Sequence, residues 1–187
     1  MEVAALLVRW LTEHGHLPAA GAAIRYASSC SGIDAFAAAA ARLYSLEYMH
    51  AAEWDAAARR VLSDAWALPS DAIMLDARSP DAAAAAEVDL YVLTPDCVNF
   101  SKRRHGRDAA VVADGGVDVA SVLGFVRMRR ARVVIVENVD DADGVGVIDT
   151  ALHALGGYAW VSQRLCPLEH AGQPVRRERR FWVGVRA

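Results

Sequence analysis

Short apolar runs alternate with helical patterns along most of this 187-residue chain, and this alternation constrains the fold more than any other feature. The apolar runs predict strands at about 24–29, 47–51, 72–75, 88–93 and 132–136. Helical patterns lie at about 33–45, 54–66, 79–86, 117–130 and 144–155. Strands joined by helices require crossover connections, so the sequence predicts an α/β fold around a mainly parallel sheet.

The two ends of the chain add elements to this core. Residues 3–14 predict a helix before the first strand. Near the other end, apolar runs at 158–162 and 181–185 are expected to pair as an antiparallel edge, joined by a loop around 166–176. No repeat or Pro/Gly/Ser-rich linker divides the chain. We therefore expect one domain over residues 1–187, in which residues 1–20 form the N-terminal helix and a linker.

Composition narrows the class of protein. A chain that is 55% hydrophobic and 23% charged is globular rather than disordered. It contains no run of 18 apolar residues and no signal-peptide pattern, which predicts a soluble, intracellular protein with no membrane partner. Three cysteines without closely spaced histidines predict free thiols and no metal site.

The net charge of −3 does not by itself indicate a nucleic-acid-binding protein. Basic residues nevertheless cluster at 102–107, 127–132 and 176–180. Such clusters can contact a phosphate backbone, and they can equally be solvated helix faces and loop tips. The sequence leaves both interpretations open.

Ligands of open α/β sheets bind beyond the carboxyl ends of the strands, so the residues after each apolar run are the candidates. A small-residue turn, Ser28 to Asp34, follows the first run and suits either a nucleotide-like ligand or a simple strand-to-helix turn. Glu53 and Trp54 follow the second run, where an acid can hold ribose hydroxyls and a ring can stack on a purine. Asp76 follows the third run. Both acids also fit the simpler role of a helix cap.

Cys97 and Glu137 are the candidates for chemistry. Cys97 follows the fourth run, after Thr94 and Pro95, and it precedes a lysine and arginines that favour the thiolate. We predict that it is a nucleophile, although a lone cysteine is more commonly a small core residue. Glu137 ends a fully apolar run, where burial would raise its pKa and make it a proton donor.

These strand ends, taken in order, resemble the cytosine-C5 DNA methyltransferases over about residues 24–186. Ser31-Gly32-Ile33 resembles the centre of the family's Phe-x-Gly-x-Gly-Gly cofactor turn, and Glu53-Trp54 and Asp76 resemble its ribose-binding and adenine-binding residues. The run from Pro95 to Ser101 resembles Pro-Pro-Cys-Gln-x-Phe-Ser, and 137–139 matches Glu-Asn-Val. Residues 172–179 resemble the segment that ends in Gln-x-Arg-x-Arg, with Arg177 and Arg179 at the two arginines.

The resemblance implies a Rossmann-like class I methyltransferase fold and S-adenosylmethionine as the cofactor, with S-adenosylhomocysteine as its product and no metal. It implies that Cys97 attacks C6 of a flipped cytosine in DNA, that Glu137 contacts N3 and that Arg179, with Arg177, holds O2. The implied cofactor-binding residues are Ser31, Gly32, Ile33, Glu53, Trp54, Asp76 and Pro95.

The chain also departs from the family pattern. Cys30, Asp34 and Ala35 stand where a phenylalanine and two glycines are usual, and Asp96 and Val98 flank the predicted nucleophile. Val175 replaces a glutamine. We expect Asp96 to raise the pKa of the Cys97 thiol.

No segment corresponds to a target-recognition domain, and helix 3–14 is a candidate for the place of the family's final helix. Three functions follow from these departures. The chain can be a minimal DNA methyltransferase, the catalytic half of a split enzyme whose partner chain supplies recognition, or an inactive cofactor-binding regulator. RNA remains an alternative substrate.

Overall fold

The structure is a computed structural model that describes residues 2–76, 87–95, 119–120, 122–123, 126 and 130–187. Within these residues, seven strands form one mixed sheet in the order β3-β2-β1-β4-β5-β7-β6. The strands are β1 (Ala23–Ser29), β2 (Ser45–Ala52), β3 (Ile73–Met74), β4 (Leu90–Leu93), β5 (Val133–Val139), β6 (Tyr158–Leu165) and β7 (Arg179–Arg186).

Strands β1 to β5 are parallel to one another, and β7 lies antiparallel between β5 and β6. This arrangement confirms the predicted Rossmann-like sheet with an antiparallel strand near the C-terminus. The last two strands pair in antiparallel register, with Val161 opposite Val183. Trp160 covers the backbone of Gly184 on the facing strand, so closely that a Cβ at residue 184 would lie 2.5 Å from the indole ring. That contact explains a glycine inside a strand.

The helices are α1 (Glu2–Glu13), α2 (Ala35–Ala40), α3 (Ala56–Trp66), α5 (Ala142–Leu155) and α6 (Pro167–Ala171), with a 3₁₀ turn η1 at Ser70–Ala72. Helix α2 is shorter than the predicted span 33–45, because Asp34 caps its first turn and Ser45 already belongs to β2. Helix α6 was not predicted; it lies within the expected loop 166–176 and begins at Pro167. The predicted helix 79–86 lies outside the described residues.

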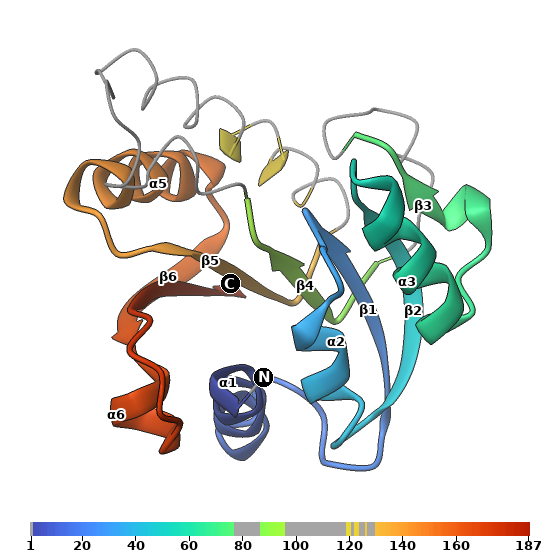
Figure 1. The fold of residues 1–187 in the computed structure, drawn as a ribbon. Helices are drawn as coiled ribbons and strands as arrows, with labels where there is room; N and C mark the ends of the chain where they lie inside the picture. Colours follow the sequence, from blue (N-terminus) through green and yellow to red (C-terminus); the bar gives the residue numbers. More distant parts are fainter. Residues whose placement is uncertain (1, 77–86, 96–118, 121, 124–125, 127–129) are drawn as a thin grey trace.

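Helices pack on both faces of the sheet (Figure 1). On one face, α1 and α2 bury an apolar cluster that includes Val8, Leu11 and Phe36 against Ile135 of β5. On the other face, α5 packs Ile148 and Leu152 against the opposite side of the same strands. Four described residues of the predicted helix 117–130 also lie buried in that second cluster: Val119, Val122, Leu123 and Val126. The carboxyl ends of the parallel strands therefore emerge between two packed layers.

Candidate active site

The turn between β1 and α2, residues 30–34, has an unusual backbone. Cys30, Gly32 and Asp34 all have positive φ, at 54°, 53° and 50°. Gly32 adopts this conformation without steric cost, whereas a left-handed residue with a side chain costs about 1–2 kcal/mol. Such strained positions persist only where their surroundings hold them, and they cluster at functional sites.

Two neighbouring strand ends hold this turn in place. From β2, the carboxylate of Glu53 accepts a 2.7 Å hydrogen bond from the amide of Gly32, and the carbonyl of Ala52 accepts from the amide of Ser31 at 3.2 Å. From β4, the hydroxyl of Thr94 donates to the carbonyl of Cys30 at 2.6 Å. The turn is therefore anchored on both sides where it faces the ends of the strands.

Glu53 is 6% exposed, and its second carboxylate oxygen accepts from the amide of Asp55 at 2.9 Å. The helix cap that sequence reasoning left open for Glu53 is provided by Asp55, whose side chain accepts from the amide of Ala58 at 2.8 Å. Trp54 and Ile33 are exposed, by 75% and 68% of their surface. Asp76, which follows β3, is also exposed. Large exposed apolar side chains beside a buried carboxylate suit a ligand with a flat ring and hydroxyl groups.

A cavity of about 530 Å³ opens beside the turn. It brings Ser31 and Ile33 of the turn together with Glu137, Arg177 and Arg179. Its described walls also include Val3 and Ala4 of α1, Thr94, Leu165 of β6, Gln173, Val175 and Phe181. The predicted residues Glu53, Trp54 and Asp76 are not among these walls. The cavity therefore brings one part of the predicted cofactor site together with three predicted catalytic residues, Glu137, Arg177 and Arg179.

Glu137 and Arg179 form an ion pair at 2.9 Å, and each side chain is only about a fifth exposed, at 21% and 19%. The two residues lie on adjacent antiparallel strands, near the ends of β5 and β7. Burial raises the pKa of Glu137, while the positive charges of Arg179 and Arg177 act in the opposite direction. The net effect is a raised pKa, so Glu137 keeps its proton to higher pH than an ordinary glutamate.

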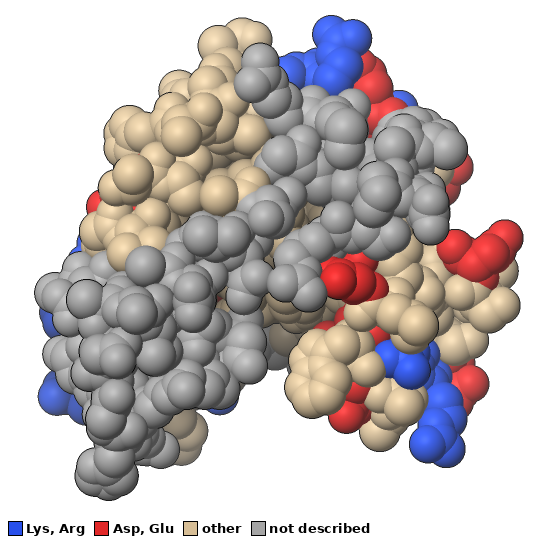
Figure 2. All heavy atoms as spheres, turned by 90° about the horizontal axis from the view of Figure 1, so that it is seen from above, with Lys and Arg blue, Asp and Glu red and all other residues tan. Residues whose placement is uncertain are grey.

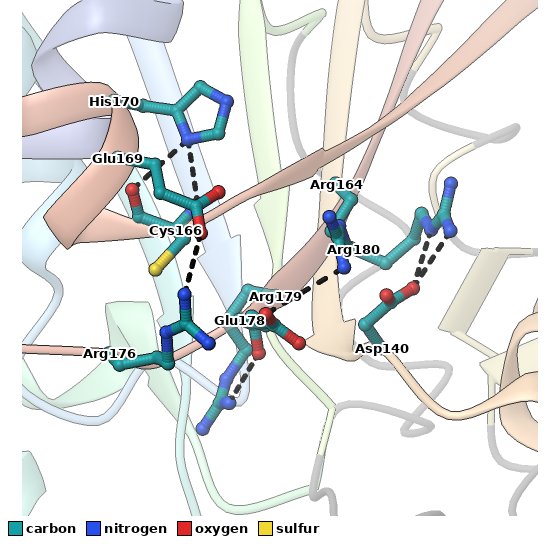
Figure 3. Close-up of polar contacts among 9 residues, drawn as sticks. All are labelled: Asp140, Arg164, Cys166, Glu169, His170, Arg176, Glu178, Arg179 and Arg180. Carbon is teal, nitrogen blue, oxygen red and sulfur yellow. Dashed lines mark hydrogen bonds and ion pairs between the residues drawn. The ribbon is translucent and has the colours of Figure 1, made fainter.

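Ion pairs also hold the segment that carries Arg177 (Figure 3). Arg176 pairs with Glu169 of α6 at 3.2 Å, and Glu178 pairs with Arg164 of β6 at 3.7 Å. Arg180 pairs at 2.8 Å with Asp140, just after β5. Three neighbouring elements therefore fix the start of β7 and the arginines beside it.

The predicted nucleophile, Cys97, lies outside the described residues. The chain leading to it is described as far as Pro95, whose carbonyl accepts a 3.3 Å hydrogen bond from the side chain of Asn138. Asn138 is buried and directly follows Glu137. The chain thus leaves β4 beside the end of β5.

Sequence reasoning missed a buried polar cluster beneath the turn. Asp34 accepts hydrogen bonds from the hydroxyls of Tyr26 and Tyr48, at 2.7 and 2.5 Å. Tyr48 also contacts Ser28, which contacts Ser31. The tyrosines stand at strand positions where an aromatic residue predicts only core packing, so the one available signal was the acid at a position usually held by glycine.

Basic side chains of the described residues form separate groups, with acidic side chains among them, on the face seen in Figure 2. The predicted cluster 102–107 lies outside the described residues, as do residues 127–129 of the predicted cluster 127–132. Within the described part of the chain, no group of three or more histidines, cysteines or acids is placed to hold a metal ion. A search of the same residues finds no helix with the length and apolarity needed to span a bilayer.

No family model matches the chain, and no curated protein matches it. Solved methyltransferase structures do. DNMT2 of Spodoptera frugiperda superposes with a TM-score of 0.60 and 16% identity over 87% of this chain and 50% of that one. A putative DNA modification methyltransferase of an E. coli prophage superposes with a TM-score of 0.57 and 17% identity, over 87% of this chain and 47% of that one. An rRNA methylase of Streptococcus thermophilus superposes with a TM-score of 0.56 and 12% identity, over 97% of this chain and 95% of that one.

The chain spans about half the length of the insect and prophage proteins. At identities this low, the superpositions establish the fold alone, and the strand order β3-β2-β1-β4-β5-β7-β6 agrees with them. The chain has the Rossmann-like fold of the S-adenosylmethionine-dependent methyltransferases.

Proposed function

We propose that the protein methylates carbon 5 of cytosine in DNA, using S-adenosylmethionine and a covalent adduct between Cys97 and C6 of the base. The observation that carries this proposal is the ion pair of Glu137 and Arg179, which lines one cavity with Ser31 and Ile33 of the turn. A buried acid with a raised pKa beside a fixed guanidinium can recognise both N3 and O2 of a cytosine.

The residues of the turn fit an adenosine-containing cofactor. The carboxylate of Glu53 is held at the end of β2, where it has further lone pairs for ribose hydroxyls. Trp54 and Ile33 offer exposed apolar surface for the adenine ring. When bound, S-adenosylmethionine supplies an electrophilic methyl group to carbon 5 and leaves as S-adenosylhomocysteine.

The chain's own residues activate the base. The Cys97 thiolate forms a bond to C6, and the electron pair displaced from the C5–C6 double bond makes C5 nucleophilic. Glu137 donates its proton to N3 as charge builds on the ring, and Arg179 hydrogen-bonds O2. After C5 has been methylated, loss of the C5 proton to solvent expels Cys97 as a thiolate and restores the C5–C6 double bond. The proton on N3 then returns to Glu137.

The form of the substrate and the means of target recognition are part of the proposal. A target base in duplex DNA must be flipped out of the stack, at a cost of a few kcal/mol. The chain spans about half the length of the Spodoptera frugiperda and E. coli prophage proteins, and a partner chain that supplies target recognition is a further proposal. RNA is the second candidate substrate, favoured because the chain covers 95% of the Streptococcus thermophilus rRNA methylase.

Trapping on DNA that contains 5-fluorocytosine tests the proposal, because fluorine at C5 prevents release of the cysteine. With S-adenosylmethionine present, we expect a complex that survives denaturing electrophoresis for the wild type and for Cys166→Ala, and none for Cys97→Ala. A complex on matched 5-fluorocytosine RNA but not on DNA would reassign the substrate. Absence of any complex, while the protein binds S-adenosylmethionine, would support the inactive regulator instead.

A further inference from the structure

Asp34 is a buried carboxylate at the edge of the cavity, and the proposed chemistry does not use it. Its side chain caps α2 by accepting from the amide of Ala37 at 2.9 Å. The same oxygen accepts from the Tyr26 hydroxyl at 2.7 Å, and the other oxygen accepts from the Tyr48 hydroxyl at 2.5 Å. The residue is 4% exposed.

All of these donors are electrically neutral. Among the described residues, no arginine, lysine or histidine forms an ion pair with Asp34. Burial, reinforced by the negative charge of Asp34, raises the pKa values of Tyr26 and Tyr48 above their ordinary range. Both hydroxyls therefore remain protonated, and they donate to the Asp34 carboxylate.

The carboxylate lies where a bound ligand would experience its charge. Asp34, Ser28 and Ser31 line the cavity together, and Ser31 and Gly32 belong to the turn assigned to the cofactor. Arg177 and Arg179, the cationic residues among the described walls of the cavity, lie with Glu137 at the end of β5 and the start of β7. A buried charge acts over several ångströms because the protein interior screens it weakly.

Resting on the proposed function, we infer that Asp34 is a specificity-determining residue whose carboxylate favours the cationic sulfonium of S-adenosylmethionine over the neutral thioether of S-adenosylhomocysteine. Methyl transfer converts the first ligand into the second and removes the positive charge. The same carboxylate then holds the product less tightly than the substrate cofactor. Asp34 thus promotes exchange of product for fresh cofactor.

Asp34→Asn removes the charge and conserves the shape. The amide oxygen can still accept from Tyr26 and Ala37, while the amide NH₂ can donate to Tyr48, whose hydroxyl is then free to donate to Ser28. Asp64 on α3 is exposed and supplies the matched control, Asp64→Asn, which removes the same charge from a helix that contributes no described wall to the cavity. If Asp34→Asn does not fold, Asp34→Gly removes the charge and suits the left-handed backbone at φ 50°.

The experiment is calorimetric titration of each protein with S-adenosylmethionine and, separately, with S-adenosylhomocysteine. The measured quantity is the ratio of the two affinities, because loss of structure alone lowers both affinities together. We expect the charge-removing variant to lower the ratio by roughly tenfold or more, and Asp64→Asn to leave it unchanged. An unchanged ratio in the Asp34 variant would overturn the inference. Wild-type protein that binds neither ligand would instead overturn the proposed function.

Discussion

On the β1–β2 side, the candidate site is held by hydrogen bonds from neutral donors, whereas on the β5–β7 side it is held by ion pairs. We call the first the turn half (residues 30–34 with Glu53) and the second the ion-pair half (Glu137, Arg177 and Arg179). In the turn half, backbone amides and tyrosine hydroxyls satisfy two buried carboxylates. In the ion-pair half, a guanidinium satisfies Glu137.

The difference follows from what each half has to do. A turn that binds a cofactor needs a fixed backbone, and hydrogen bonds from neutral groups fix it at any pH near neutrality. A group that exchanges a proton needs a tunable pKa, which burial and nearby charges together provide. We therefore expect changes in the ion-pair half to alter catalysis and its pH dependence, and changes in the turn half to alter cofactor binding.

The largest effect is expected from Glu137→Gln. Loss of the proton donor should slow methyl transfer by about 10²–10⁴-fold, the usual contribution of general acid–base catalysis. Affinity for S-adenosylmethionine should stay within about twofold, because the turn half is intact. Single-turnover transfer and calorimetry measure the two quantities, with the exposed Glu13→Gln as the control. A parallel loss of cofactor affinity would break the distinction between the halves.

Next in size is the stability effect of Arg179→Gln. Glu137 would remain partly buried without its guanidinium, so the free energy of unfolding at neutral pH should fall by about 3 kcal/mol. Arg176→Gln, which breaks the exposed pair with Glu169, should cost about 0.5 kcal/mol or less. Urea denaturation measures both. Equal losses in the two variants would show that the Glu137 pair gains nothing from burial.

Tyr48→Phe examines the turn half. It removes one neutral donor from the Asp34 carboxylate and should cost about 2 kcal/mol of unfolding free energy. Tyr158→Phe removes a hydroxyl that donates to the neutral carbonyl of Ala131 and should cost about 1 kcal/mol. Thermal and urea unfolding at two salt concentrations measure both losses. A loss that shrinks strongly with salt would mean that the turn half, too, depends on ion pairing.

The smallest effect concerns pH. Because the folded-state pKa of Glu137 lies above its ordinary value of 4.5, the folded protein holds this proton more tightly than the unfolded chain. The associated stability is fully present below that ordinary value and is lost as pH rises through the folded-state pKa. We expect this loss of stability in the wild type and not in Glu137→Gln. NMR titration of the Glu137 carboxyl carbon provides the direct measurement, and a value at or below 4.5 would contradict it.

Much of the fold could be predicted because each buried strand carries its own apolar signal. The run Val133 to Val136 predicted β5, and it placed Glu137 at the carboxyl end of that strand, where the structure has it. Ends of elements were harder to predict. Helix α2 ends at Ala40, but the predicted span ran further because the alanines continue to Ala41 and carry no stop signal.

Candidate site residues could be named where a motif marks them along the chain, and they stayed hidden where no motif does. The ion pair of Glu137 with Arg179 joins residues predicted for one reaction from their separate motifs. The cluster of Asp34 with Tyr26 and Tyr48 joins two strands and a turn, and no spacing along the sequence indicates that the three side chains meet. Cys97 lies outside the described residues, so its role stays a prediction.

Nucleoside mass spectrometry tests the central claim most directly. Duplex DNA is incubated with the protein and S-adenosylmethionine, then digested to nucleosides. We predict 5-methyl-2′-deoxycytidine from the wild type and from Glu13→Gln, and none from Cys97→Ala. A methyl group on another atom of cytosine, or 5-methyl-2′-deoxycytidine formed equally well by Cys97→Ala, would contradict the account.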